Sequence, residues 1–264
     1  MTRRRVPAVL GAVVFGLVAS AGAFGQSPEP DRQPRFKPGV FVEYFSRTIA
    51  SDGDSAQTML KTGFGGLRFE TRISNGLSFG VLAGYGFSNA NGLVFRDLPF
   101  SIDYEAGAAG GFLAGADVHN SFIRTKKYEI EGLARFVAYF GGKKQVGVTN
   151  LNLPGGVDAR GTWMRVQAGP VLRYFGSEDL SPFISLFVDR LWGTYTVNET
   201  IFDLTGTEEK KISGKGWVRG SFGITYSPYA FFSLEAEVTA LPYNKVAGGL
   251  NFDYGGSVVG IFSF

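Results

Sequence analysis

The chain has 264 residues, 38 of them glycine and none cysteine, and its formal net charge at pH 7 is +3. The lack of cysteine excludes disulfides, thiolate metal sites and a lipid-modified cysteine. Because three arginines and no acidic residue lie within residues 1–23, the remaining chain is neutral, and the basic balance gives no support for a nucleic-acid partner.

The N-terminal segment has the order of a secretory signal peptide. Arg3, Arg4 and Arg5 precede an apolar run to Val18, and small residues follow up to Ala23. This order predicts a cleaved signal peptide over residues 1–23, with a retained membrane anchor as the alternative. Residues 24–38 are polar and rich in proline, and they predict a flexible periplasmic lead-in.

From residue 39 onwards, apolar and polar residues alternate over segments long enough to cross a membrane as tilted strands. The clearest alternation runs from Leu77 to Ser88. The predicted strands are 39–49, 58–72, 77–88, 112–124, 128–140, 161–175, 183–197, 214–226, 231–241 and 254–264. Within residues 183–197, Arg190 falls on the apolar face, which predicts a β-bulge near Asp189.

The connections predict an orientation. Residues 141–160 and 198–213 are long and polar, as outer loops are, whereas short turns suit the periplasmic side and place both termini there. The charged run Glu208–Lys211 is interpreted as a solvated loop, and residues 89–111 as either a loop or a strand pair above the membrane. Two aromatic girdles are expected, an outer one at Tyr85, Phe87, Tyr139, Phe140, Trp192 and Tyr195, and a periplasmic one at Tyr174, Phe175, Tyr226, Tyr229, Phe231, Phe262 and Phe264.

The last segment has an apolar face formed by Tyr254, Val258, Gly260, Phe262 and Phe264. A terminal Phe with an aromatic residue two positions before it resembles the C-terminal assembly signal of bacterial outer-membrane β-barrels. The chain as a whole resembles the superfamily of small bacterial outer-membrane β-barrels, the porin-like and outer-membrane-protein-A-like group. This resemblance implies insertion into outer-membrane lipid by the barrel-assembly machinery.

The expected fold is therefore all-β, a closed antiparallel up-and-down transmembrane β-barrel over residues 39–264. About ten strands are predicted, with eight or twelve as alternatives. A soluble β-sandwich would also show alternation, but it does not predict a signal peptide, aromatic girdles and a terminal Phe together.

The inward faces of the predicted strands carry charged residues that should pair across the interior or line water. A salt-bridged plug and a narrow aqueous passage are weighed equally, because about ten strands lie near the size at which an interior opens. The predicted lumen residues are Glu43, Arg47, Arg68, Glu70, Arg72, Glu129, Glu131, Arg135, Arg165, Arg173, Lys215, Arg219, Glu235 and Glu237.

The single histidine raises an alternative. His119 and Ser121 share one face of a predicted strand with Asp117, and a Ser–His pair oriented by a carboxylate performs nucleophilic hydrolysis. The His-x-Ser spacing is similar to that of outer-membrane phospholipases and lipid A deacylases, and Asp117–His119 is loosely similar to the Asp–His pair of omptin proteases. A lipid or peptide hydrolase is thus the alternative function.

The preferred function is a non-enzymatic integral outer-membrane barrel. It would be either a narrow porin-like channel for small polar solutes or a structural and surface-display protein. Adhesion through residues 198–213 is a further possibility that leaves no residue signature. No cofactor and no metal site is expected, since one histidine and no cysteine offer no ligand cluster.

Overall fold

The computed structural model describes residues 36–52, 57–74, 76–90, 92–99, 102–104, 107–146, 155–177, 179–201, 203–244 and 249–263. The predicted signal peptide, most of the lead-in and Phe264 lie outside these residues. The first strand already begins at Phe36, so the last three residues of the predicted lead-in are part of the sheet. None of the described segments forms a helix long and apolar enough to cross a membrane.

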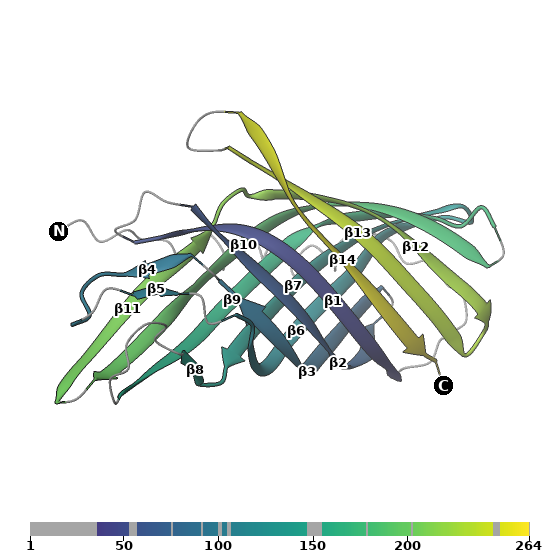
Figure 1. Cartoon of the computed structure of the whole chain (residues 1–264). Helices are drawn as coiled ribbons and strands as arrows, with labels where there is room; N and C mark the ends of the chain where they lie inside the picture. Colours follow the sequence, from purple (N-terminus) through teal and green to yellow (C-terminus); the bar gives the residue numbers. More distant parts are fainter. Residues whose placement is uncertain are drawn as a thin grey trace.

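All regular structure in the described residues is antiparallel β (Figure 1). A 12-stranded sheet and a separate two-stranded pair, β4–β5, are present. The strands are β1 (Phe36–Ser51), β2 (Gln57–Ser74), β3 (Leu77–Asn89), β4 (Leu93–Phe95), β5 (Ile102–Tyr104), β6 (Ala109–Arg124), β7 (Tyr128–Gly141), β8 (Lys144–Val146), β9 (Gly155–Tyr174), β10 (Leu180–Ile201), β11 (Leu204–Gly214), β12 (Val218–Tyr229), β13 (Phe232–Asn244) and β14 (Leu250–Phe262).

The sheet thus has 12 strands rather than about ten. The additional strands are β8 and β11, which lie in segments expected to be loops. There, the hairpins that link β7 to β9 and β10 to β12 continue as paired strands instead of opening into irregular chain. The predicted strand 214–226 begins later than expected, at Val218, because Gly214 ends β11.

Strand pairing follows chain order and returns to its starting point. Beyond the successive hairpins, β1 pairs with β14 from Gly39↔Ile261 to Phe45↔Gly255, and β10 pairs with both β9 and β12. The backbone hydrogen bonds therefore follow a ring, and the strands wrap around a common interior in Figure 1. Ring-like pairing satisfies the edges that an open sheet would leave exposed.

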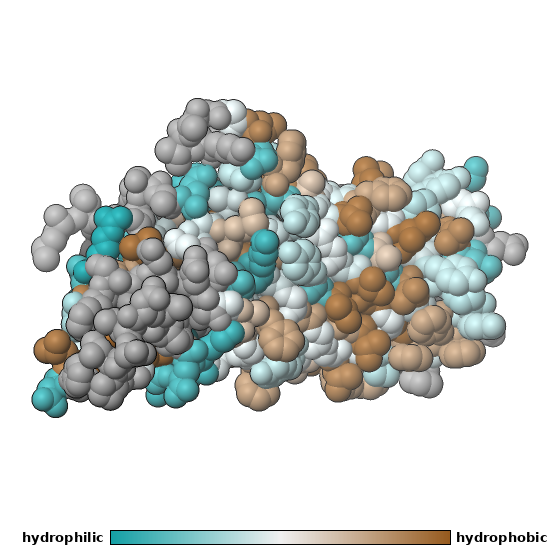
Figure 2. All heavy atoms as spheres, in the orientation of Figure 1, coloured by the Kyte–Doolittle hydropathy of each residue, from teal (hydrophilic) through white to brown (hydrophobic). Residues whose placement is uncertain are grey.

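The two faces of this sheet are of opposite polarity. Val42 is 63% exposed on the outer face, whereas its neighbour Glu43 is 5% exposed on the inner face. In Figure 2, apolar side chains gather over one half of the long axis, and polar side chains lie toward the end that holds β11. Such an apolar exterior is unfavourable in water and typical of strands that face lipid.

The prediction of a β-bulge near Asp189 in β10 is wrong. Register with β9 is continuous from Val188↔Ala168 through Arg190↔Val166, so Arg190 stays on the outer face. There its guanidinium lies over the ring of Trp217, 3.0 Å from the centroid. A cation–π contact lowers the cost of an outward arginine, so the strand needs no extra residue.

Near Arg190, β10 and β1 instead change the strands with which they pair. Pairing of β10 with β12 ends at Val188↔Val218, and pairing with β11 begins at Trp192↔Ser213. Likewise, β1 exchanges β14 for β11 between Phe45 and Ile49. We call this region the branch point; the β11–β12 turn (residues 215–217) lies within it. Beyond it, β13 and β14 rise away from the other strands at the top of Figure 1.

Residues 89–111 contain the strand pair that was one of the two predictions. Leu93 and Phe95 of this pair are buried, and they share one hydrophobic cluster with Val157, Val197 and Ile212 of the large sheet. β4 is therefore packed against the inner face of β9, β10 and β11. It fills the interior at the end of the molecule that lies beyond the branch point.

Two expectations for this end of the molecule are wrong. Glu208 and Lys210 are buried on the inner face of β11 rather than solvated, and a Glu208 carboxylate oxygen accepts a hydrogen bond from the Asp97 backbone N–H at 2.8 Å. Tyr139 and Tyr195 are also buried, at 0% and 1% exposure, so they do not belong to an outer girdle. Both lie near strand ends, but their positions in the alternation point inward.

Candidate functional site: the charged interior

Most of the predicted lumen residues lie on the inner face of the strands. Glu43, Arg47, Arg68, Arg165 and Arg219 are buried, while Glu70, Arg72, Glu129, Glu131, Arg135, Arg173, Glu235 and Glu237 are half-buried. Lys215 differs, because it lies in the β11–β12 turn outside any strand. Arg72 lies near the end of β2, where its Nε donates to the Ser74 carbonyl at 3.3 Å.

Asp189 is the centre of the largest ion-pair group. Its side chain is fully buried, and Arg47 approaches it at 2.9 Å, Arg165 at 2.8 Å and Arg219 at 3.6 Å. Gln167 also donates to it at 3.0 Å. These partners come from β1, β9 and β12, so they reach Asp189 on β10 from several sides of the ring. A buried carboxylate needs such compensation, since desolvation alone would make it very costly.

Asp117 is the centre of a second group, on β6. Arg68 donates to both of its carboxylate oxygens, at 3.1 and 2.9 Å, in the bidentate geometry that makes Arg–carboxylate pairs strong. Arg68 also contacts Glu70 at 3.0 Å. Gly80 lies directly opposite Asp117 on β3, and a Cβ at that position would collide with the Asp117 carboxylate. The glycine therefore provides the space that this buried aspartate occupies.

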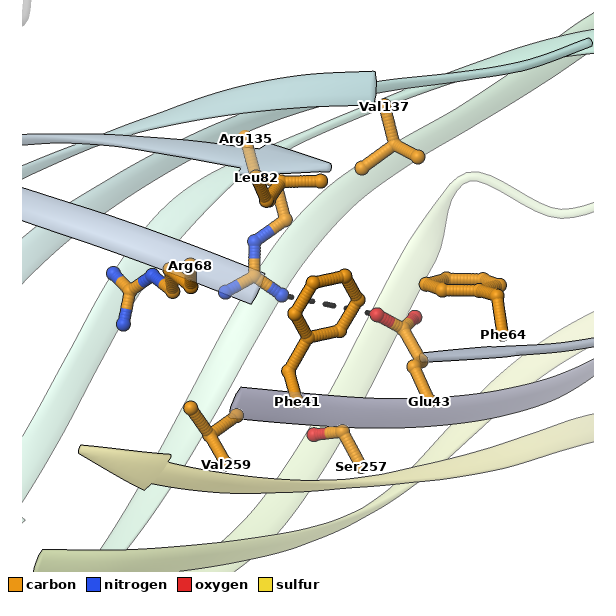
Figure 3. A pocket seen from close by; sticks show the side chains of 9 residues that line it. All are labelled: Phe41, Glu43, Phe64, Arg68, Leu82, Arg135, Val137, Ser257 and Val259. Atoms are coloured by element: carbon orange, nitrogen blue, oxygen red, sulfur yellow. Dashed lines mark ion pairs between the residues drawn. The ribbon is translucent and has the colours of Figure 1, made fainter. Parts of the chain in front are cut away.

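Glu43 joins the two groups across the interior. It accepts a hydrogen bond from Arg165 at 2.7 Å and lies 3.9 Å from Arg135, which in turn lies 3.6 Å from Asp117. Figure 3 shows Arg135 reaching from one side of the interior toward Glu43 on the other, beside the ring of Phe41. The cavity between them measures about 10 Å³, which is room for roughly one water molecule.

A third group lies toward the other end of the strands. Arg173 contacts Glu131 at 3.4 Å and Glu235 at 3.2 Å, and it also donates to the Thr225 hydroxyl. Glu237 lies 4.0 Å from Arg219. Glu129 instead accepts a hydrogen bond from Ser121. Most of the predicted charges are thus brought into contact with an opposite charge.

The sequence prediction missed the carboxylates at the centres of these groups. Asp189 was overlooked because the assumed bulge interrupted the alternation; uninterrupted, the inner face reads Phe183, Ser185, Phe187, Asp189. Asp117 was considered only with His119. Asp253 was missed because the last strand was predicted to begin one residue later, yet it accepts two hydrogen bonds from Thr48 at 2.8 Å each.

His119 and Ser121 are engaged separately. His119 Nε2 lies 2.9 Å from a guanidinium nitrogen of Arg68 and 3.3 Å from a carboxylate oxygen of Asp117, so Asp117 and His119 are in contact. Ser121 Oγ donates to Glu129 at 2.7 Å. Among the described contacts there is no hydrogen bond between His119 and Ser121, which a base and its nucleophile require. The described residues also contain no group of three or more His, Cys, Asp or Glu side chains that could hold a metal ion.

A ring-like antiparallel sheet with an apolar exterior and a charged, paired interior defines a β-barrel of the outer-membrane type. No protein-family model and no curated protein sequence matches the chain. Among solved structures, the chain is similar to the translocator domain of autotransporter NalP from Neisseria meningitidis, at 12% identity, with 97% of each chain covered and a TM-score of 0.50.

Two further solved structures resemble it. The outer membrane protease OmpT from Escherichia coli has 9% identity and a TM-score of 0.49, with 91% of this chain and 99% of that chain covered. An outer membrane channel from Pseudomonas putida F1 has 11% identity and a TM-score of 0.45, with 90% and 100% covered. At such identities the likeness concerns the fold alone. That fold is the outer-membrane type of β-barrel, as the sequence resemblance predicted.

Proposed function

We propose that this protein is a closed, non-enzymatic outer-membrane β-barrel that serves a structural or surface-display role rather than acting as an open diffusion channel. The observation that carries this proposal is the convergence on Asp189, where side chains from β1, β9 and β12 meet across the interior. Ion pairs at that point occupy the space through which a solute would pass. The packed β4–β5 pair obstructs the same path further along.

The orientation belongs to the same proposal. The long β10–β11 hairpin, paired as far as Ile201↔Leu204, would project from the outer surface, and the termini would lie in the periplasm. Supporting this, the turns at the other end are short, as at residues 125–127 between β6 and β7. Short periplasmic turns and long outer hairpins are the usual asymmetry of these barrels.

Conductance of purified protein in planar bilayers tests the filled interior. We expect no stepwise conductance from the wild type. A heat-modifiable band on gel electrophoresis verifies separately that the protein is folded in lipid. Stepwise openings of uniform size would overturn the proposal and favour a narrow channel.

The non-enzymatic part is tested with lipid-release and peptide-release assays on the wild type and on Ser121→Ala. We expect no turnover from either protein. Turnover by the wild type that Ser121→Ala abolishes would establish the hydrolase instead.

A further inference from the structure

A second cavity lies at the branch point, where β14 leaves β1. Pairing of β1 with β14 ends at Phe45↔Gly255, and pairing with β11 begins only at Ile49↔Gly214. The cavity in this interruption measures about 10 Å³, and its lining includes Arg219 of the inner face and Tyr254, which is 58% exposed on the outer face. The cavity therefore lies within the thickness of the sheet, between the charged interior and the lipid side.

Three residues that line this cavity have hydrogen-bond donors without a partner among the described residues. They are Ser46 through Oγ, Arg47 through Nε and Arg219 through Nε, and all three residues are at most 5% exposed. A buried unsatisfied donor costs about 1 to 3 kcal/mol. Because these three residues line one cavity, a group that accepts hydrogen bonds and fills it would satisfy donors that are otherwise unpaired.

The charges of the lining favour an anion. Arg219 lies 3.6 Å from Asp189 and 4.0 Å from Glu237, beyond hydrogen-bonding distance, so its guanidinium is poorly satisfied. Arg47 and Arg165 also line the cavity, but both are already paired with Asp189, so Arg219 is the arginine that an anion would compensate. Asp253 is the opposing negative charge, but both of its oxygens already accept hydrogen bonds from Thr48.

We propose that the branch point is an oxyanion site that takes one oxygen of a phosphate or carboxylate group. The donors are Ser46, Arg47 and Arg219, and the volume admits a single oxygen-sized atom while the rest of the ligand lies outside, beside Tyr254. Because Tyr254 is exposed on the outer face here, the anionic headgroup of an amphiphile can reach the site between β1 and β14. A free inorganic anion offers the same chemistry, so the experiment compares both sources.

Titration calorimetry of the full-length mature protein in neutral detergent micelles tests the site. The probes are n-dodecyl phosphate and inorganic phosphate at constant ionic strength. We expect saturable binding that is weakened about tenfold or more in Arg219→Gln and in Ser46→Val, as for the loss of a hydrogen bond to a charged group. Much tighter binding of dodecyl phosphate identifies a lipid headgroup as the ligand, whereas equal affinities identify a free anion.

Ser185→Val is the matched control, because Ser185 is another buried serine, and its hydroxyl is already paired with Ser221. It should bind both probes like the wild type. If Arg219→Gln fails to give a heat-modifiable band, Ser46→Val carries the test alone. Absence of saturable binding to the wild type, or equal binding by Ser46→Val and Ser185→Val, would overturn the proposal.

Discussion

We expect Asp189 to contribute more to the free energy of unfolding than any single arginine around it, because several guanidinium groups share its one carboxylate. Asp189→Asn keeps the shape of the side chain but leaves buried positive charges uncompensated. Breaking a buried ion pair in this way costs about 3 to 5 kcal/mol. We expect the free energy of unfolding to fall by that amount, measured by urea titration in lipid vesicles with tryptophan fluorescence as the signal.

Glu209→Gln provides the comparison for Asp189, because Glu209 lies on the exposed face of β11. Removal of an exposed charge should change the free energy of unfolding by about 0.5 kcal/mol or less. If the two substitutions had the same effect, the ion pairs around Asp189 would not be what holds this part of the interior together.

Gly80 makes a residue-scale prediction for the second charged group. Gly80→Ala would place a methyl group against the Asp117 carboxylate and displace it from Arg68, so we expect a loss of about 1 to 3 kcal/mol in the free energy of unfolding. Gly220→Ala is the control, since nothing lies within 4 Å of a Cβ at that position of β12. Equal stability of the two variants, measured in the same urea titration, would contradict this account of Gly80.

At the scale of the element, β14 is essential to the ring-like pairing, because it pairs with β1 on one side and with β13 on the other. A chain that ends at Asp253 leaves two unpaired edges facing lipid, and each unsatisfied backbone group there costs several kcal/mol. We expect this truncated chain to give no heat-modifiable band after refolding into vesicles.

Phe252→Ala is the control for the truncation, because Phe252 is exposed near the opposite end of β14 and its loss removes no backbone pairing. It should refold as the wild type does. Since no assembly machinery is present in this experiment, it separates ring closure from recognition of the C-terminal signal. A folded band from the truncated chain would show that β14 is dispensable for closure.

The predicted strands have one apolar and one polar face, whereas the missed strand β11 has charged residues on both faces. In β3, every second residue from Phe79 to Phe87 faces outward, and a contrast in hydropathy records it in the sequence. In β11, Glu208 and Lys210 face inward while Glu209 and Lys211 face outward, so both faces are charged and no contrast exists. Alternation therefore predicts strands where one face meets lipid and fails where hairpins extend beyond it.

For the candidate site, the sequence predicted which face the charged residues occupy but not which residues pair. Alternation placed Arg47, Arg165 and Arg219 on the inner face without knowledge of their partners. The partners come from strands distant in the chain, as Arg47 and Asp189 do at a separation of 142 residues. Which carboxylate lies at the centre depends on the ring-like strand pairing and on the branch point, neither of which leaves a local pattern in the sequence.

For the whole molecule, the sheet separates two environments, and its three tryptophans test that separation. Trp163 is fully buried inside, stacked on Tyr139 at 5.3 Å, whereas Trp192 and Trp217 are 40% and 59% exposed on the outer face. Variants that keep one tryptophan each, with the others replaced by Phe, should respond differently to vesicles with brominated acyl chains.

Fluorescence of the protein that retains only Trp192 should be quenched strongly by brominated lipid, because its indole faces the acyl chains or their boundary. The protein that retains only Trp163 should keep most of its emission, since the sheet lies between its indole and the bromine atoms. The protein that retains only Trp217 tests the depth of the branch point in the membrane. Quenching of its fluorescence would show that the Arg190–Trp217 pair lies within reach of lipid. Stronger quenching of Trp163 than of Trp192 would mean that the inner and outer faces are reversed, and the filled interior could not then face away from the membrane.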